Sequence, residues 1–393
     1  MTGNENPKKK KRRLIRIIGS LLSLAVLTYI AIMLISGRGL SLSWLTGLFP
    51  DREPAEMADE FHFEVGRDRV FAYLGDSLAA AGTLGVQVLD IGGGETLRDP
   101  FRMSKPAISA LNGRAIAFDI GGSAVRVFDK SRTVSTIETH GAIVSASINR
   151  NGWFCVCTLG SGGYKGVATV YNDKGNVVYN VSLSSGYILS AELSPDNGSL
   201  AVLNLTGNGS RITFYHGLSS ESADNAYDFP GGLIVDIWYP PDGDLVAVTT
   251  ESLITVSKNG VGGELYAFHG RRLGAYAFED DFFALHLLDY GVGYRGQLVT
   301  LAPDGKLLGV LATDRELVSV SSCGGYLAIL RNDGPGLFSA ELEECPISAE
   351  RVPTTGASLI LSLGDGAALA AGDHSAAVIR ADASEELPED DAQ

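Results

Sequence analysis

The sequence is poor in cysteine and histidine, and these shortages exclude several classes of protein. Four cysteines in 393 residues are too few for a disulfide scaffold, and none stands in a Cys-x-x-Cys pair or at a zinc-type spacing. Cys155 and Cys157 lie two residues apart in an apolar run, so we expect both thiols to be buried on one face of a strand. The six histidines stand singly, without the spacing of metal ligands. We therefore predict no metal site.

Catalytic motifs are also missing. Gly-x-Ser-x-Gly does not occur in a strand–turn–helix setting, and the glycines at 92–94 lack the Lys and Ser or Thr of a phosphate-binding loop. We expect these glycines to form a turn with positive φ. No cofactor is expected.

Positive charge is scarce outside the N-terminus. The chain has 31 basic and 46 acidic residues, but residues 1–16 hold seven basic residues and one acidic residue. The rest carries 24 basic and 45 acidic residues, a net charge of −21. A body this acidic is repelled by the phosphates of nucleic acids and of anionic lipids, so nucleic-acid binding is not expected.

One long apolar run is present, the 19 uncharged residues from Ile17 to Ile35. At ~1.5 Å per residue this run forms a helix of ~28 Å, close to the ~30 Å hydrocarbon core of a bilayer. The basic block before it predicts a cytoplasmic N-terminus and an extracytoplasmic remainder of a single-pass cell-membrane protein. A cleaved signal peptide is the alternative, but the apolar run is long and Ser36–Gly39 is a poor cleavage site.

A unit of about forty residues repeats through the remaining chain. In each copy an apolar run ends at a turn and a second apolar run follows, with turns at Gly75, Gly113, Gly152, Gly198, Gly243, Asp281, Gly324 and Gly366. The spacings of 38 to 46 residues are typical of four-stranded propeller blades. Asn-Gly and Asp-Gly turns separate two further strands in each unit. The pattern predicts an all-β, eight-bladed β-propeller, with seven blades as the alternative because the Gly75 unit is the least regular.

The ends of the repeat region complement each other. The final unit offers only three strands, at 358–363, 367–371 and 376–380, whereas an unassigned strand at 61–65 precedes the first unit. We expect that strand to become the outer strand of the last blade and to close the ring by main-chain hydrogen bonds.

The predicted organisation has five segments. They are a basic cytoplasmic tail (1–16), a transmembrane helix (17–35), a stalk (36–60), the propeller (61–380) and an acidic disordered tail (381–393).

Two stretches of the chain, Asp76–Asp90 and Asp119–Asp129, resemble an uncharacterised group of Gram-positive proteins, domain of unknown function 5711. The resemblance covers nearly the whole chain and implies one N-terminal span and a propeller-like body. It brings no catalytic residues. The blades are more loosely similar to WD40-like and quinoprotein-like repeats, although the Gly-His and Trp-Asp dipeptides of WD40 repeats and the regular Trp of quinoprotein blades are missing.

Loop composition is the main functional signal. In a propeller blade the loops between strands two and three lie on one face with the connections between blades. Here those loops are the longer ones, and they include Gly- and Tyr-bearing segments, at 159–165, 206–210, 289–295, 332–335 and 373–374. Tyr and Arg suit recognition because they bring contact area and donors. We predict a partner-binding face made by Tyr164, Lys165, Tyr290, Tyr294, Arg295 and His374, with ordinary solvated loops as the alternative.

Small polar residues recur at matched positions of the innermost strands. Ser145, Ser190, Asp236 and Ser319 occupy one position, and Ser147, Glu192, Trp238 and Ser321 follow two residues later. We expect these side chains to line a wet central tunnel. Glu192 and Asp236 are the only acidic pair there that could perform acid–base chemistry, and a hydrated lining is favoured over a catalytic pocket.

The leading hypothesis is a membrane-tethered extracytoplasmic scaffold or sensor that binds a protein or an envelope component without catalysis. The first alternative is a hydrolase or lyase that acts on envelope carbohydrate through Glu192 and Asp236. The second is a passive structural surface protein. The fold alone does not choose among them.

Overall fold

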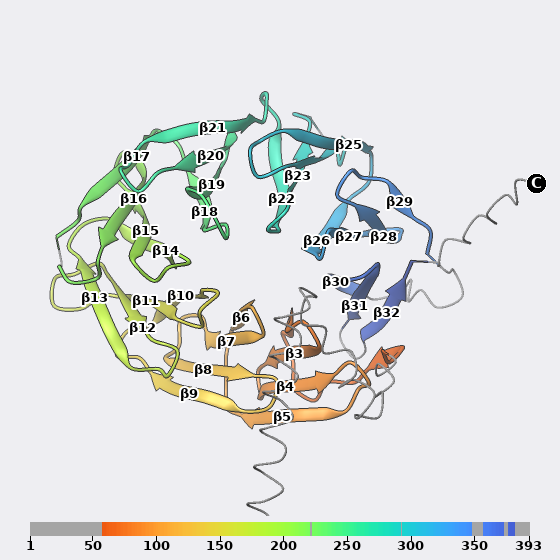
Figure 1. Ribbon diagram of the computed structural model, residues 1–393, viewed down its shortest axis with the longest axis horizontal. Helices are drawn as coiled ribbons and strands as arrows, with labels where there is room; N and C mark the ends of the chain where they lie inside the picture. Colours follow the sequence, from red (N-terminus) through yellow and green to blue (C-terminus); the bar gives the residue numbers. More distant parts are fainter. Residues whose placement is uncertain (1–56, 221, 292, 348–356, 373–375, 382–393) are drawn as a thin grey trace, which may run out of the picture. The chain divides into compact units, whose positions relative to one another are not determined.

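The computed structural model describes residues 57–220, 222–291, 293–347, 357–372 and 376–381, which form eight four-stranded antiparallel sheets arranged as a ring (Figure 1). The eight-bladed prediction is confirmed, and the seven-bladed alternative is wrong. No helix of membrane-spanning length and apolarity occurs among these residues. The predicted span (17–35), the tail before it (1–16) and nearly all of the predicted stalk and acidic tail lie outside them.

The strands follow the chain order within each of the first four blades. Blade 1 contains β2 (Val70–Tyr73), β3 (Ser77–Gly82), β4 (Gly85–Asp90) and β5 (Glu95–Pro100). Blade 2 contains β6 (Pro106–Leu111), β7 (Arg114–Asp119), β8 (Ala124–Asp129) and β9 (Thr133–Glu138). Blade 3 contains β10 (Ile143–Ile148), β11 (Phe154–Leu159), β12 (Gly166–Tyr171) and β13 (Val177–Leu183). Blade 4 contains β14 (Tyr187–Leu193), β15 (Ser199–Thr206), β16 (Gly209–His216) and β17 (Asn225–Pro230).

Blades 5 to 7 repeat this order and blade 8 departs from it. Blade 5 contains β18 (Ile234–Trp238), β19 (Leu245–Thr249), β20 (Ser252–Val256) and β21 (Gly262–Ala267). Blade 6 contains β22 (Arg272–Phe278), β23 (Phe283–Leu288), β24 (Gly296–Leu301) and β25 (Leu307–Thr313). Blade 7 contains β26 (Leu317–Cys323), β27 (Tyr326–Arg331), β28 (Gly334–Ser339) and β29 (Glu344–Cys345). Blade 8 contains β30 (Ala357–Gly364), β31 (Ala367–Gly372), β32 (Ala376–Arg380) and the N-terminal β1 (Glu60–Phe61).

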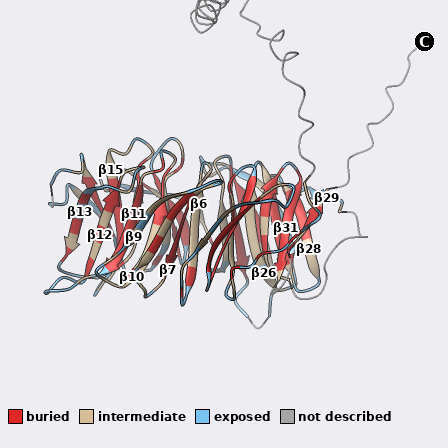
Figure 2. Ribbon diagram, turned by 90° about the horizontal axis from the view of Figure 1, so that it is seen from below, coloured by how far each residue is buried: buried red, intermediate tan, exposed pale blue. Residues whose placement is uncertain are grey.

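The hydrophobic core is divided among the interfaces between neighbouring blades. Each of eight apolar clusters joins side chains from two adjacent blades. Cys155 and Cys157 lie buried in the cluster between blades 3 and 4, as expected from their spacing. Figure 2 shows the buried parts of the strands inside the ring and the exposed residues at its two faces. Short apolar strands are enough to form this core because the second strand of a blade is covered on both sides by the neighbouring blades. All residues of β3 and of β23, the second strands of blades 1 and 6, are buried.

The ring closes as predicted, but with a shorter strand than 61–65. β1 pairs with β32 through Glu60↔Ala377 and Phe61↔Ala376 only. The chain then leaves β32, because Glu64 and Val65 bond to blade 1: Glu64 N–H donates to Gln87 Oε1 at 2.8 Å, and Val65 carbonyl accepts from Leu84 N–H at 2.8 Å. Phe63 and Val65 remain buried between blades 8 and 1.

The antiparallel order defines two faces of the ring. The turn face carries the turns between strands one and two and between strands three and four of each blade. The loop face carries the loops between strands two and three and the connections between blades. β1 starts and β32 ends at the turn face. Near that point Ala58 N–H donates to Ile91 carbonyl of blade 1 at 2.7 Å, and Arg380 of blade 8 pairs with Asp59 at 2.8 Å. The described chain therefore begins on the turn face, bound to two blades.

Candidate functional site

A central channel is surrounded by the first strand of every blade, and these strands share an irregularity. Six of the eight carry a β-bulge near their start, which shifts the register between Ile143/Ser145, Ile188/Ser190, Ile234/Asp236, Leu273/Ala275, Leu317/Ser319 and Ala357/Leu359. The matched polar positions of the sequence come directly after this bulge. A bulge redirects the following side chains, so a repeated bulge places them alike in each blade.

Several of these side chains join neighbouring blades to each other. Ser147 Oγ donates to Ala191 carbonyl on the next inner strand at 2.7 Å. Ser321 Oγ accepts from Ser362 N–H at 3.0 Å, and Ser319 Oγ accepts from Ile360 N–H at 3.2 Å. The inner strands of adjacent blades converge near the axis, and a short hydroxyl can satisfy a backbone group of the neighbour there. These three serines thus connect blades, a role that differs from the predicted hydrated lining.

Glu192 and Asp236 are brought together, on the adjacent inner strands β14 and β18. Burial, followed by the charge of Asp236, raises the pKa of Glu192 well above its usual value, and a hydrogen bond from Ser147 acts against this. Burial also raises the pKa of Asp236, opposed by Tyr276, whose hydroxyl donates to Asp236 Oδ2 at 3.0 Å, and by the backbone N–H of Ile237 at 2.9 Å. Both oxygens of Asp236 are therefore already hydrogen-bonded, and Glu192 is the member of the pair that retains a proton most readily.

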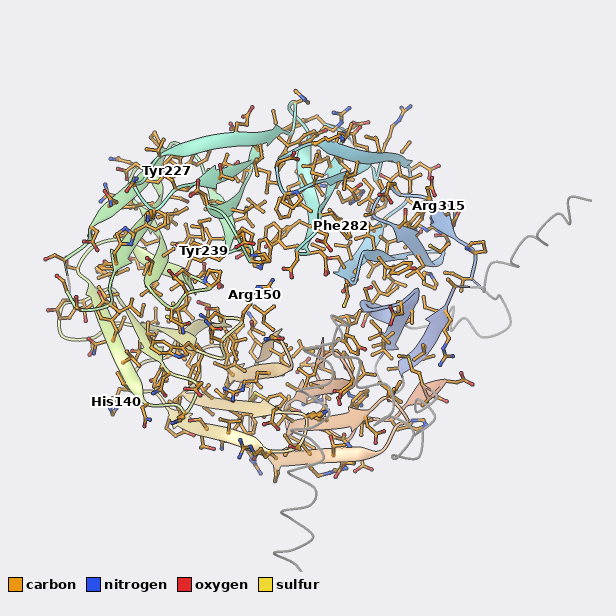
Figure 3. All side chains as sticks on the ribbon, viewed as in Figure 1. His140, Arg150, Tyr227, Tyr239, Phe282 and Arg315 are labelled. Atoms are coloured by element: carbon orange, nitrogen blue, oxygen red, sulfur yellow. The ribbon has the colours of Figure 1, made fainter. Side chains whose placement is uncertain are left out.

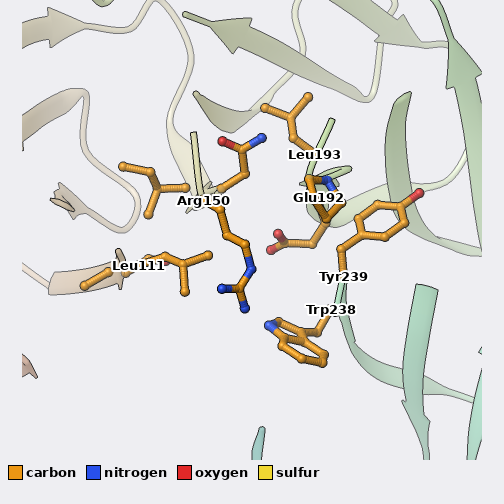
Figure 4. A pocket seen from close by; sticks show the side chains of 11 residues that line it. Leu111, Arg150, Glu192, Leu193, Trp238 and Tyr239 are labelled. Atoms are coloured by element: carbon orange, nitrogen blue, oxygen red, sulfur yellow. The ribbon is translucent and has the colours of Figure 1, made fainter. Parts of the chain in front are cut away.

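The cavity beside Glu192 is small. Its volume is about 100 Å³, and Arg150, Trp238 and Tyr239 contribute to its wall (Figure 4). Small-molecule sites usually occupy about 300–1,000 Å³, so this cavity has room for a few water molecules only. The cavity that Glu192 lines thus lacks space for a carbohydrate ring, and Asp236 is not part of its wall.

A larger cavity occupies the mouth of the channel on the turn face. Its volume is about 590 Å³, and inner strands or turns of blades 1, 2, 5, 6, 7 and 8 line it. Four aromatic side chains form part of its wall: Phe71, Tyr73, Trp238 and Phe278. The rings of Trp238 and Phe278 are stacked at 5.4 Å between centroids, with 15° between their planes. Glu279 and Asp280 add carboxylates to the same wall. We call this space the vestibule.

An ion pair joins Arg150 of blade 3 to Asp280 of blade 6, whose carboxylate lies in the wall of the vestibule. Figure 3 shows Arg150 extending toward the centre of the ring. Its turn is fixed by Asn149, whose side-chain oxygen accepts from the N–H groups of Asn151 at 3.1 Å and Trp153 at 3.0 Å. The turn of Asp280 is closed by the bond from Glu279 N–H to the carbonyl of Phe282 at 3.0 Å. These local bonds hold a cation and an anion on turns that lie three blades apart in the ring.

Negative charge dominates this mouth. The turns between strands one and two of the eight blades, all of them described, contain a single basic residue, Arg150. The same turns contain eight acidic residues: Asp76, Asp196, Asp242, Asp244, Glu279, Asp280, Asp281 and Asp365. Burial raises the pKa of Glu279, whose Oε1 accepts from Gly324 N–H at 3.2 Å. In the described part of the chain no three acidic, histidine or cysteine side chains converge as metal ligands.

The predicted partner-binding residues lie on the loop face but do not form one patch. Tyr164 and Lys165 are exposed in blade 3, whereas Tyr290, with 83% of its surface exposed, Tyr294 and Arg295 belong to blade 6. Blades 4 and 5 separate the two groups. His374 lies outside the described residues.

Two of the loops predicted to be long are in fact short. Between β15 and β16 only residues 207 and 208 intervene, and between β27 and β28 only residues 332 and 333. Gly209 and Gly334 follow with φ of 131° and 142°, a conformation that glycine adopts freely, and this permits the tight reversals.

Exposed apolar side chains fill the interval between the two predicted groups. In blades 3 to 5, strand ends and connections on the loop face expose a series that we call the apolar arc: Leu159, Tyr187, Leu205, Leu233 and Val235. Tyr187 is 61% exposed and pairs directly with Leu205 across β14 and β15. The arc was not predicted from the sequence because its members belong to apolar strand runs that resemble buried ones. Their position at the ends of the strands was the feature that could have distinguished them from buried residues.

Comparisons with known proteins agree with the propeller. The C-terminal WD40 domain of Sif2 superposes with a TM-score of 0.57 and 13% identity, over 83% of this chain and 99% of that domain. A structure titled as the eukaryotic initiation factor gives a TM-score of 0.52 and 12% identity, over 79% of this chain and 83% of the other. At these identities the likeness establishes the fold alone. No curated protein matches this chain. A family model described as a family of unknown function (DUF5711) matches residues 54–333.

Proposed function

This chain belongs to the DUF5711 family of unknown function, and from that premise we propose that it is a membrane-tethered extracytoplasmic propeller that binds a protein or cell-envelope component through its loop face, without catalysis. In this proposal residues 1–16 are the cytoplasmic tail, 17–35 the membrane helix, 36–60 the stalk, 61–380 the propeller and 381–393 an acidic tail.

The tether is supported by the sequence and by the point at which the described chain begins. Ile17–Ile35 has the length and apolarity of a span, and a basic block precedes it. The described chain starts on the turn face, next to β1. A tether joined there leaves the opposite loop face free for a partner.

The observation that carries the binding role is the run of exposed side chains on the loop face. The apolar arc of blades 3 to 5 continues at each end into an aromatic group, Tyr164 in blade 3 and Tyr290 with Tyr294 in blade 6. Exposed apolar and aromatic side chains that gather on one face are typical of protein interaction sites. Carbohydrate hydrolysis by Glu192 and Asp236 has less support, because the cavity beside Glu192 is about 100 Å³ and Asp236 is engaged by Tyr276.

Crosslinking in membranes followed by affinity purification tests this proposal. We expect Tyr187→Ser with Leu205→Ser, and separately the change of Tyr164, Tyr290, Tyr294 and Arg295 to Ala, to remove most of the crosslinked partner. The matched control is Val177→Ser with Val261→Ser, which alters two exposed apolar side chains away from the loop face. Retention of every partner by both loop-face variants would reject the binding face.

Orientation is tested separately. A cysteine introduced by Asn208→Cys, in an exposed loop-face turn, should react with a membrane-impermeant thiol reagent in intact cells. Reaction only after the cells are opened would contradict the extracytoplasmic assignment.

A further inference from the structure

We propose that the vestibule binds a cationic group, a guanidinium or primary ammonium on an apolar stem, which pairs with Asp280 and Glu279 between the aromatic side chains of the channel wall. Arg150 pairs with Asp280 in the structure. This inference goes beyond the proposed function, because the vestibule lies on the turn face and the proposed partner binds the loop face.

The size of the vestibule fits a ligand group. Its volume of about 590 Å³ falls within the ~300–1,000 Å³ of typical ligand sites, whereas the cavity beside Glu192 is about 100 Å³. Six blades contribute to its wall, and the side chains of Phe71, Trp238 and Phe278 make much of this wall apolar. A partner group that enters here loses contact with water over most of its stem.

The charge of the vestibule selects a cation. Glu279 and Asp280 line it, and the turns between strands one and two of the eight blades hold six further carboxylates and one guanidinium. A concave wall of one sign concentrates counter-ions. Glu279 makes no ion pair within the described residues; its carboxylate accepts the Gly324 N–H at 3.2 Å. The Arg150 guanidinium nevertheless lies close enough to lower the pKa of Glu279 against the effect of burial, so both carboxylates of the wall attract a cation and repel an anionic ligand.

The aromatic walls strengthen the same preference. A guanidinium or ammonium is attracted to the face of an aromatic ring, and Trp gives the strongest interaction. Trp238 lines both the vestibule and the small cavity, and its ring is held by stacking on Phe278 and by an edge contact with Phe283 at 5.9 Å. The ring is therefore preorganised, which reduces the entropy lost on binding.

Arg150 serves as an internal example of the ligand. Its guanidinium crosses from blade 3 to Asp280 of blade 6, so the site already accepts this chemical group. The Nε–H of Arg150 is buried without a hydrogen-bond acceptor among the described residues. Arg150 also lines the small cavity with Glu192, as Figure 4 shows. An incoming cation can therefore replace Arg150 on Asp280, and the displaced guanidinium remains in the small cavity, whose wall includes the Glu192 carboxyl group.

Two sources can supply such a group, a side chain of a partner protein or a free amine, and titrations of the full-length protein in detergent distinguish them. The probes are acetyl-Gly-Arg-Gly-amide labelled with a fluorophore, the same peptide with citrulline in place of arginine, and agmatine as the free cation. Saturable binding of the arginine peptide, with no binding of the citrulline peptide, is the expected result. Agmatine that competes as well as the unlabelled peptide identifies a free amine as the preferred source, and weaker competition identifies a side chain. Absence of binding by both cations overturns the proposal.

Three variants separate the site from the general field of the protein. Asp280→Asn should weaken peptide binding about tenfold, because one charge-assisted contact is lost. Arg150→Met should strengthen it several-fold, because the internal competitor is removed. Asp242→Asn, the matched control, removes the same charge from a neighbouring turn that does not line the vestibule, and binding should change less than about twofold.

Two results would contradict the proposal. One is equal weakening by Asp280→Asn and Asp242→Asn, and the other is loss of binding in Arg150→Met while its thermal unfolding matches that of the wild type. If Asp280→Asn does not fold, the affinity of Arg150→Met for the arginine peptide still tests the proposal. If the protein still crosslinks to its partners but does not bind the arginine peptide, the vestibule site is refuted and the proposed function stands. Loss of partners in the loop-face variants tests the proposed function and does not test the vestibule.

Discussion

The closing strand is the feature on which the ring most depends, and Phe61→Ala tests it. β1 contributes only two register pairs with β32, so main-chain bonds alone hold the seam weakly. Phe61 compensates: it is 1% exposed, lies in the cluster between blades 8 and 1, and stacks on Phe63 at 6.3 Å between ring centroids. We expect the seam to open when this ring is removed.

The size of the effect follows from the burial of the side chain. Replacement of a buried Phe by Ala costs about 3–5 kcal/mol in a protein core. We expect about 3 kcal/mol in the free energy of unfolding, the lower end of that range, because a two-residue strand at the start of the fold can move to fill part of the space left by the ring.

Urea denaturation followed by circular dichroism measures the loss, and hydrogen exchange locates it. Amides of β32 and β31 should exchange faster in Phe61→Ala, since Val378 N–H, which donates to Asp59 at 2.9 Å, loses its partner when β1 leaves. The matched control is Phe214→Ala, a fully buried ring between blades 4 and 5. It should cost a similar free energy and leave exchange in blade 8 unchanged.

The reasoning is refuted if Phe61→Ala loses less than about 1 kcal/mol, well below the usual cost for a buried Phe, or if both variants speed exchange equally around the ring. Either result would mean that the eight interfaces hold the propeller closed without β1.

Three further predictions concern groups inside the ring. Burial and the charge of Asp236 raise the pKa of Glu192 above its ordinary 4.5, so the folded protein keeps a proton that the unfolded chain releases. The free energy of unfolding therefore falls as the pH rises above about 4.5. The loss is about 1.4 kcal/mol for each unit that separates the pKa of Glu192 in the folded protein from its pKa in the unfolded chain. Glu192→Gln should therefore unfold at a higher urea concentration than the wild type at pH 8 and at a similar one at pH 4; a lower midpoint at pH 8 contradicts this. Cys155 and Cys157 should resist alkylation until the protein unfolds, because both thiols are buried and the pKa of Cys155 is raised by Cys157 and by burial. Mass spectrometry of the native protein after treatment with the alkylating reagent measures this, and modification of either cysteine would disprove the prediction. Gly85→Ala should lower the free energy of unfolding by about 2 kcal/mol, because Gly85 has φ of 137° and a Cβ there would lie 2.3 Å from the carbonyl oxygen of Asp99. The control Gly291→Ala should have almost no effect on the free energy of unfolding, because a Cβ at Gly291 meets open space.

The sequence was sufficient to predict the architecture because the propeller is built from local signals. Each blade places a short turn, which contains glycine in seven of the eight blades, between two apolar runs. This pattern gave both the number of blades and the origin of the closing strand. The length of β1 was not predictable, since Glu64 and Val65 could bond to β32 or to blade 1, and the choice depends on how the connection turns at Gly66.

The candidate site was less accessible to sequence reasoning. The matched polar positions were recognised, but the bonds of Ser147 and Ser321 to neighbouring blades depend on how closely the inner strands converge. The pair of Arg150 and Asp280 links residues 130 positions apart, and it exists only because the ring brings the turns of blades 3 and 6, three blades apart, to the same central opening. No local pattern in either turn indicates its partner.

The short segment from Met57 to Phe61 also has a mechanical consequence. Ala58 is bonded to blade 1, while Met57 and Asp59 are bonded to Arg380 of blade 8. A pull on the preceding chain therefore loads the junction of these two blades before any other part of the ring. Rupture there would release the ring at a single place and leave seven interfaces under no strain, so resistance to force is set by a handful of contacts at one seam.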